Sequence, residues 1–309
     1  MQRFRRFLLL AVVAGFSHQA LAQLVPVQSQ YFINPYVYNP AAVGAAGRTQ
    51  FHTSFKKQWT GAEGSPTLAS LSFEKPVHRL SLGANLTNLS EGPFNRLSTH
   101  LTAGYRFQMS NRPKQWLSFG MSLGFRLNTL RASKLDDPDD PAVVSYDNAS
   151  FVLDGGLGVR YRYERFTLGL SVPRLTHALP YGNDNALLGG FRPWNHLIAS
   201  ASYDFIPHLT DWKITPTVLY HYAANFDGQL EGMLMTSLRN KFWGGAGYRH
   251  RYGTNVLAGA EITPMIAFSY AYSLSGSANH FPSSHEVILR IRIDKQETTR
   301  RYAGDSQAP

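Results

Sequence analysis

One pair of side chains in this sequence has residue types that could support catalysis. Ser98 and His100 are two residues apart, so in an extended strand they would point to the same face and could touch. A serine beside a histidine, with a polar residue to orient the ring, would make a lipase at a membrane surface. The chain contains many serines, so pairs of this kind are expected by chance. We therefore predict no catalytic residues, no cofactor and no enzymatic activity.

Metal ligation is the second chemistry that the side chains suggest. The stretch DDPDDP places four carboxylates within the five residues from Asp136 to Asp140, and oxygen-rich loops can hold calcium. The stretch lacks the alternating ligands and the following glutamate of a calcium loop, so a solvated acidic loop is the simpler interpretation and calcium binding stays open. The histidines are scattered, and none stands at zinc-ligand spacing with a second ligand. We therefore assign no metal ligands.

Arginines are the most informative charged residues. They share the polar face of alternating segments, at Arg106, Arg126, Arg160, Arg162, Arg249, Arg290 and Arg292. Inside a closed sheet they would make an electropositive lumen that receives an acidic peptide or passes anions. Alternatively, they pair internally with Asp154, Glu261 and Glu286, because an unpaired charge in a narrow lumen is costly. The sequence leaves both interpretations open.

The elements that must position these residues are long β-strands. Between Gln115 and Asn128, apolar and polar residues alternate strictly over twelve residues, which is longer than a typical soluble strand. Similar alternation covers residues 80–86, 97–109, 151–163, 166–172, 266–274 and 287–293, and weaker alternation covers 48–58, 67–75, 196–206, 212–222, 229–239, 241–250 and 254–262. We count about 14 strands, and bacterial transmembrane barrels favour even numbers.

The composition of the polar faces favours a membrane barrel over a soluble β-protein. These faces carry Ser, Gly, Thr and Arg rather than the Lys and Glu of a solvated surface, which suits a confined interior. The longest polar stretches, 132–148 and 177–193, fit long loops at one end of a barrel. Aromatic residues near strand ends predict girdles at the two membrane interfaces, at Trp59, Trp116, Tyr161, Tyr163, Trp194, Phe205, Trp212, Tyr220, Tyr222 and Trp243. The predicted fold is all-β, a transmembrane antiparallel β-barrel.

The first 22 residues predict export. Three arginines precede an apolar run too short to span a bilayer, and Ala20-Leu21-Ala22 has the form of a cleavage site. This segment holds three of the 30 Lys+Arg and none of the 20 Asp+Glu, so the remainder has a net charge of 27 − 20 = +7. A basic protein can bind nucleic acid, anionic lipid or acidic ligands, and export disfavours nucleic acid. The absence of cysteine excludes disulfides.

The stretch YFINPYVYNPAAVG, residues 31–44, is apolar but unfit for regular structure. It contains Asn-Pro twice, and proline cannot donate to a sheet ladder and disfavours a helix before it. Its aromatic residues nevertheless demand burial. We predict an irregular segment, 23–47, that packs inside the lumen or across its mouth as a plug or clasp; the alternative is a docking strip for a periplasmic partner.

Several motifs together resemble the PorP/SprF family of type IX secretion outer-membrane proteins. They are QYFINPYVYNPAAVG from residue 30, FKKQWTGAEGSP from residue 55, DDPDDPAV from residue 136, RFTLGLSVPRL from residue 165, ITPMIAFSYAYS from residue 262 and SSHEVILRIRI from residue 283. None is specific alone, but their order and spacing are, and they cover almost the whole chain after the first 22 residues. The sequence departs from the family in its last strand, which ends at Ile293 before a polar tail rather than near a terminal aromatic residue.

The resemblance implies an accessory role in secretion. It implies binding to the C-terminal sorting domain of a cognate cargo, such as a gliding adhesin, or to translocon components, in order to export the cargo or retain it at the surface. The residues then expected to bind a partner are Tyr31, Phe32, Asn34, Pro35, Tyr36, Asn39, Pro40 and Trp59. The alternative function is an anion-preferring diffusion porin. The expected organisation is a signal peptide (1–22), the irregular segment (23–47), a barrel embedded in outer-membrane lipid (48–293) and a polar tail (294–309).

Overall fold

A computed structural model describes residues 28–29, 31–111, 113–131, 149–175, 196–207, 210–224, 228–250, 252–275 and 282–293. The expected signal peptide, the acidic loop at 136–140 and the polar tail from residue 294 lie outside these residues. So do Trp194 and the whole of the polar stretch 177–193.

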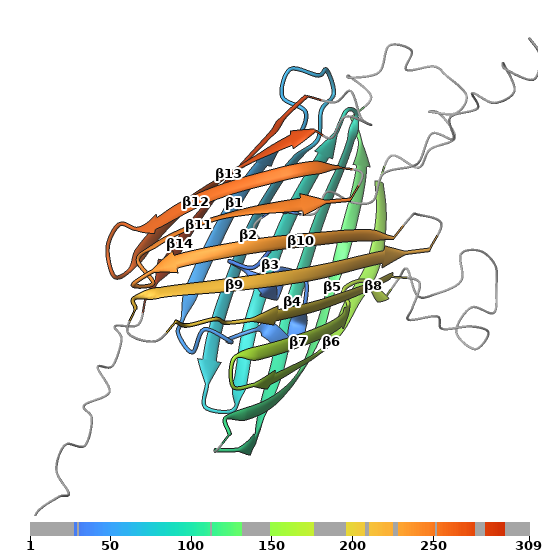
Figure 1. The fold of residues 1–309 in the computed structure, drawn as a ribbon. Coiled ribbons are helices and arrows are strands. Elements are labelled where there is room, and N and C mark those ends of the chain that lie inside the picture. The colour runs from blue at the N-terminus through green and yellow to red at the C-terminus, as the bar shows by residue number, and fades with distance from the viewer. Residues whose placement is uncertain are drawn as a thin grey trace, which may run out of the picture.

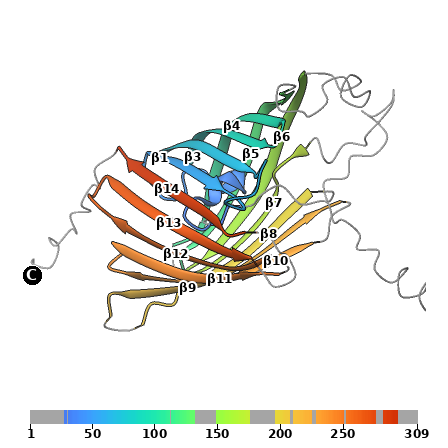
Figure 2. The ribbon, with the colours of Figure 1, turned by 90° about the horizontal axis from the view of Figure 1, so that it is seen from above.

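Within the described residues, fourteen antiparallel strands close into a single barrel (Figures 1 and 2). Each strand pairs with its neighbours in the chain, and β1 closes the barrel against β14, where Gln50 lies opposite Arg292. The strands are β1 Gln50–Lys57, β2 Thr67–Val77, β3 Leu80–Glu91, β4 Phe94–Ser110, β5 Gln115–Leu130, β6 Ala149–Tyr163, β7 Phe166–Val172, β8 His196–Tyr203, β9 Trp212–Ala223, β10 Gln229–Leu238, β11 Phe242–Arg249, β12 Gly253–Glu261, β13 Ile266–Ser275 and β14 Ser284–Arg292. The predicted fold class is confirmed.

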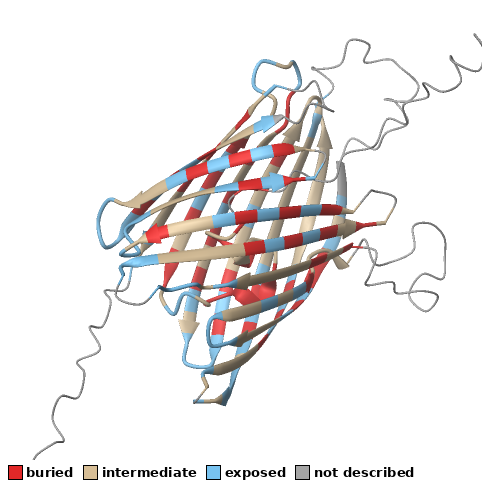
Figure 3. Ribbon diagram, in the orientation of Figure 1, coloured by how far each residue is buried: buried red, intermediate tan, exposed pale blue. Residues whose placement is uncertain are grey.

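Burial alternates along each strand, as Figure 3 shows by its red and blue bands. In β5, Phe119, Met121 and Leu123 are exposed outward, whereas Ser118 and Ser122 are buried inward. An outward apolar face with an inward polar face is the arrangement of a barrel surrounded by lipid. Pairing of β1 with β14 closes the sheet, so neither strand has an unpaired edge there. Lipid could not satisfy the backbone N–H and C=O groups of such an edge. Among the described residues, no helix has the length and apolarity needed to cross a bilayer.

The two ends of the barrel differ in their connections. At one end, two residues join β2 to β3 and β6 to β7, and residues 239–241 join β10 to β11. His78, Glu164, Arg239 and Asn240 in these turns have positive φ angles between 48° and 58°, as tight hairpin turns require. At the opposite end, β5 and β6 are joined by residues 131–148, and β7 and β8 by residues 173–195. We call these the short-turn end and the long-loop end; β1 begins and β14 ends at the short-turn end.

Two tryptophans depart from the predicted aromatic girdles. Trp116 and Trp243 share the inward parity of their strands, and each lies beneath an arginine in the lumen. The guanidinium carbon of Arg106 is 5.8 Å from the Trp116 ring centroid, and that of Arg290 is 5.6 Å from Trp243. The girdle prediction is therefore wrong for these two residues, because it used position along the strand and ignored which face each side chain occupies.

Candidate functional site: a plugged lumen with a basic cavity

The N-terminal segment lies inside the barrel (Figure 2). We call its described residues, 28–29 and 31–47, the plug. It contains two single-turn 3₁₀ helices, η1 Pro35–Val37 and η2 Pro40–Ala42, each begun by a proline after an asparagine. Asn39 caps η2, since its Oδ1 accepts a hydrogen bond of 2.9 Å from the Ala41 amide. The two Asn-Pro pairs thus turn the chain within the lumen and keep it out of the β-ladder.

Polar groups on the inner wall hold the plug in place. Tyr36 donates from its hydroxyl to Thr102 Oγ1 at 2.9 Å, and Asn34 donates from Nδ2 to Ser72 Oγ at 2.8 Å. Other hydrogen bonds join Gly44 N to Glu74 Oε2 (2.7 Å), Ser29 N to Glu286 Oε2 (2.7 Å), Gln28 Nε2 to Ser54 Oγ (2.7 Å), Ser171 Oγ to the Tyr38 carbonyl (2.7 Å), and Arg106 Nη2 to the Gly44 carbonyl (3.1 Å). These hydrogen bonds satisfy polar groups of the plug, whose buried and irregular backbone forms no β-ladder of its own.

A glycine surface on β4–β6 receives η2. Gly104 pairs with Gly120 across the sheet, and Gly120 pairs with Gly158. A Cβ atom on Gly120 would overlap the backbone of Pro40 and Ala41, and one on Gly158 would overlap the Asn39 side chain. The small residues on the polar face therefore make room for the plug backbone.

Aromatic side chains carry the plug across to the opposite wall. Tyr31 packs with Ile198 of β8 and Leu219 of β9, and Phe32 packs on a cluster that includes Met233 of β10 and Leu257 of β12. We call Tyr31, Phe32 and Tyr38 the aromatic layer; the Tyr31 ring meets those of Phe32 and Tyr38 edge-on, at centroid distances of 5.4 and 6.4 Å. The plug thus contacts strands on both sides of the lumen.

Burial shifts the acidity of the plug tyrosines. It raises the pKa of Tyr36 to about 12, an effect that the hydrogen bond to Thr102 partly offsets. Burial also raises the pKa of Tyr31 and of Tyr38 above the ordinary range, and the nearby carboxylates Glu231 and Glu286 add to these shifts. All three hydroxyls are therefore neutral at physiological pH.

Most of the predicted lumen arginines have acidic partners. The ion pairs join Arg126 to Asp154 (3.9 Å), Arg162 to Asp204 (3.6 Å), Arg249 to Glu231 (2.7 Å), Arg290 to Glu261 (3.1 Å) and Arg292 to Glu261. Glu286 pairs with Lys56 at 3.7 Å, a lysine that the sequence did not single out, and both side chains are almost fully buried. Internal pairing therefore accounts for much of the basic face.

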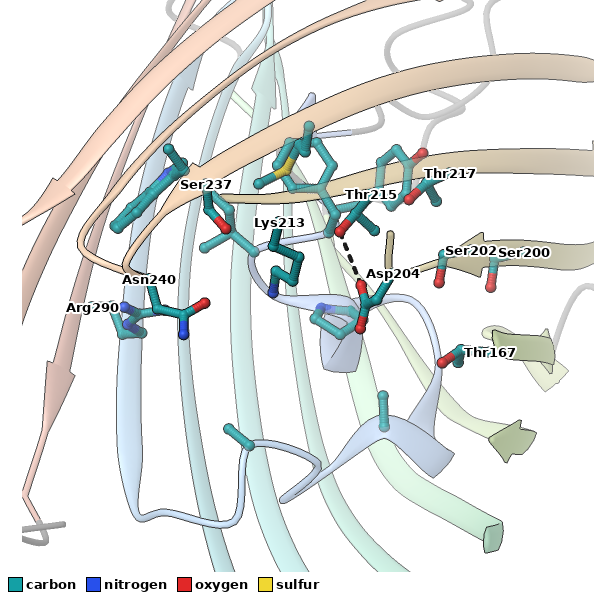
Figure 4. A pocket seen from close by; sticks show the side chains of 18 of the residues that line it. Thr167, Ser200, Ser202, Asp204, Lys213, Thr215, Thr217, Ser237, Asn240 and Arg290 are labelled. Atoms are coloured by element: carbon teal, nitrogen blue, oxygen red, sulfur yellow. Dashed lines mark hydrogen bonds between the residues drawn. The ribbon is translucent and has the colours of Figure 1, made fainter. Parts of the chain in front are cut away.

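A cavity of about 1270 Å³ occupies the lumen beside the plug. The aromatic layer forms one wall of it, and β7–β10 form another that carries hydroxyls: Thr167, Ser200, Ser202, Thr215, Thr217 and Ser237 (Figure 4). Figure 4 shows Lys213 projecting into this space, near Asp204, which accepts a 2.9 Å hydrogen bond from Thr215. Turn residues of the short-turn end, including Asn240 and Thr263, also line the cavity.

The cavity is strongly basic. Its charged lining residues are the cations Arg48, Arg160, Arg162, Lys213, Arg239, Lys241, Arg290 and Arg292 and the anions Asp204 and Glu261, a balance of 8 − 2 = +6. Arg239 pairs with Asp211 at its rim. Within the described part of the chain, no carboxylate lies within ion-pair distance of Arg48, Arg160, Lys213 or Lys241. Four cations therefore face the cavity with no acidic partner among the residues that the structure describes.

The structure brings together seven of the eight residues expected to bind a partner. Tyr31, Phe32, Asn34, Pro35, Tyr36, Asn39 and Pro40 lie in the plug. Trp59 lies apart from them, in the β1–β2 connection at the long-loop end, where its amide donates to Ser284 Oγ at 3.3 Å. Ser98 and His100 face inward on β4, and the described hydrogen bonds include none between them. Among the described residues, no three His, Asp or Glu side chains could hold a metal ion together.

Sequence reasoning missed Arg48, Lys213 and Lys241. Lys213 carried a usable signal, because it alternates with Trp212 and Ile214 in a strand whose other inward residues include Thr215 and Thr217. Arg48 and Lys241 lie outside the strands, so their place at the cavity depends on how the ends of β1 and β11 meet the lumen.

These features define a class: a bacterial outer-membrane β-barrel whose lumen is crossed by its own N-terminal segment. Solved barrels are similar to this chain. The Ralstonia pickettii toluene transporter TbuX, which shares the fold, is 10% identical with a TM-score of 0.50, covering 84% of this chain and 93% of that one. Acinetobacter baumannii Omp33 is 8% identical with a TM-score of 0.44, covering 80% of this chain and 99% of that one. No curated protein matches the chain.

The family described as "Type IX secretion system membrane protein PorP/SprF" matches residues 20–291. The chain therefore belongs to the PorP/SprF family and is a type IX secretion component of the cell outer membrane.

Proposed function

We propose that this protein is an accessory component of type IX secretion that binds a cognate secreted cargo and helps to export it or retain it at the cell surface. Its partners are the C-terminal sorting domain of a gliding-adhesin-like cargo and components of the translocon. The observation that carries the proposal is the plug: a segment held on both lumen walls favours recognition over free passage of solutes. The family membership supplies the secretion context.

A protein-binding role also agrees with the chemistry of the lumen. Several of its buried charges form ion pairs with one another, as in the Arg249–Glu231 pair at 2.7 Å. Ser98 and His100, the one pair considered for a lipase, lie inside the barrel wall rather than at an outer lipid-facing surface. We therefore propose a non-catalytic function. Undiminished secretion by the Ser98→Ala/His100→Ala variant is the expected result.

A second candidate, the anion-preferring porin, is favoured by the excess of cations lining the cavity. Planar-bilayer recording separates the two functions. The plugged structure predicts no steady conductance from the purified barrel, whereas a porin would give a large, steady, anion-selective current. A current of that kind would replace the secretion proposal with the porin.

Co-purification tests the proposed function directly. The tagged barrel is isolated in native detergent from secreting cells, and cargo and translocon components are identified in the eluate. We expect a cargo that carries its C-terminal sorting domain to be retained and the same cargo without that domain to be lost. Recovery of the barrel alone under secreting conditions would contradict the proposal.

A further inference from the structure

We propose that the basic cavity is a receptor for an extended, acidic peptide segment that enters from the short-turn end. This inference rests on the proposed function and adds to it a site, a ligand chemistry and a direction of approach.

The direction of approach follows from the lining of the cavity. Turn residues of the short-turn end, such as Asn240 and Thr263, border it, whereas its inner limit is formed by Tyr31, Ile198 and Leu219. In outer-membrane barrels the short turns face the periplasm and the long loops face outward. The first and last strands also begin and end at the short-turn end, as a chain inserted from the periplasm requires. The ligand therefore comes from the periplasmic side.

The ligand charge follows from the unbalanced cations. Ion pairs with Asp204 and Glu261 neutralise Arg162, Arg290 and Arg292 only in part. The cations Arg48, Arg160, Lys213 and Lys241 have no acidic partner among the described residues. A concave site with one sign of charge and low-dielectric walls concentrates ions of the opposite sign. The complementary ligand therefore carries several carboxylates.

The distribution of these cations indicates an extended ligand rather than a single small anion. They come from four separate places: the approach to β1, then β6, β9 and the β10–β11 turn. A compact anion site instead concentrates its donors on one point. The volume of about 1270 Å³ also exceeds the usual 300–1,000 Å³ of small-molecule sites. Charges spread around a large opening suit carboxylates spread along a chain.

The hydroxyl wall suits a peptide backbone. Thr167, Ser200, Ser202, Thr215 and Thr217 come from three adjacent strands, β7–β9, and face the same space (Figure 4). A hydroxyl can donate to a carbonyl or accept from an amide. An extended segment buried there could therefore satisfy its backbone groups without a ladder of its own, while the cations bind its side chains.

Peptide titration tests the inference with the full-length barrel in native detergent. The probe is a fluorescent ten-residue peptide of alternating Glu and Ser, and its neutral counterpart has Gln in place of each Glu. The test variant is Lys213→Gln/Lys241→Gln, which removes two cavity cations that form no ion pair with any described carboxylate. Its matched control is Lys75→Gln/Lys114→Gln, which removes the same charge from exposed side chains near the same end, outside the cavity.

We expect the acidic peptide to bind, the neutral one to bind at least tenfold more weakly, and the cavity variant to lose about tenfold in affinity while the control changes less than twofold. Equal losses in the two variants would overturn the inference. Displacement of the peptide by sulfate at equal charge concentration would overturn it as well, by showing a small-anion site.

Failure of this inference is distinguishable from failure of the proposed function. No acidic-peptide binding, together with continued cargo co-purification, would remove only the cavity receptor. Acidic-peptide binding by the purified barrel without any cargo or translocon component in the eluate would support the receptor and contradict the secretion role.

Discussion

The contact between the plug backbone and Gly120 gives the sharpest prediction, the substitution Gly120→Val. A Cβ at this position would overlap the backbone of Pro40 and Ala41, which cannot rotate aside as a side chain could. The plug must then shift. It has little free space in which to do so, because Ala41, Ala42 and Val43 are at most 4% exposed. Overpacking of a well-packed site costs about 1–3 kcal/mol. Because about 1.4 kcal/mol corresponds to a tenfold change in an equilibrium constant, the population of the state with the plug released should rise roughly 5- to 140-fold.

Limited proteolysis measures this release. Chymotrypsin cleaves after aromatic residues, and Tyr31 and Tyr36 are buried in the plugged barrel. We expect slow cleavage of the plug in the wild-type protein and a rate increased at least fivefold in Gly120→Val, with the barrel itself intact by its heat-dependent gel mobility. The released variant should also show conductance in planar bilayers.

The matched control is Gly232→Val in β10. This glycine lies on the exposed face of its strand, and a Cβ there would meet no atom within 4 Å. It therefore introduces the same residue into a strand without touching the plug. Cleavage of Gly120→Val at the rate of Gly232→Val would refute the view that the plug rests on the glycine surface.

Three further predictions concern the same contacts. Asn39→Ala removes the cap of η2 and a 3.2 Å hydrogen bond to the Val159 carbonyl, so it should weaken plug retention by about 1–2 kcal/mol. Chymotrypsin should then cleave the plug faster than in the wild-type protein, and an unchanged cleavage rate would count against the cap. Glu286→Ala removes the carboxylate that faces the buried Lys56 ammonium and should cost about 3–5 kcal/mol. Thermal unfolding should recover in part in Lys56→Met/Glu286→Leu, because the Ser29 amide still lacks its Glu286 acceptor; no recovery at all would exclude the ion pair as the cause. The pKa of the Tyr36 hydroxyl is near 10 when the plug is released but about 12 in the plugged barrel. Plug retention is therefore full below pH 10, and its free energy should fall by about 1.4 kcal/mol per pH unit between pH 10 and pH 12. Protection of the plug from protease that stays constant to pH 12 would contradict this assignment.

The strand pattern was predictable because of what surrounds the barrel. Successive residues of a strand face lipid outside and a confined polar space inside, so they must be apolar and small or polar in turn. Alternation such as Phe119, Gly120, Met121 therefore identifies each strand from the order of its residues alone. The inward parity of Arg126 and Arg162 was visible for the same reason, and so was the unfitness of the two Asn-Pro pairs for a ladder.

The sequence alone determined that the chain makes a membrane barrel, that strand arginines such as Arg126 and Arg162 face inward, and that residues 31–44 form no strand. Only the tertiary structure decided where that segment lies, because it is placed by residues distant in the chain: Gly120 and Gly158 make room for it, and Thr102 receives Tyr36. It also decided which lumen cations are neutralised. Parity places Arg160 and Arg162 on one face, but whether a carboxylate lies within reach depends on strand register and turn geometry, which long-range pairing sets.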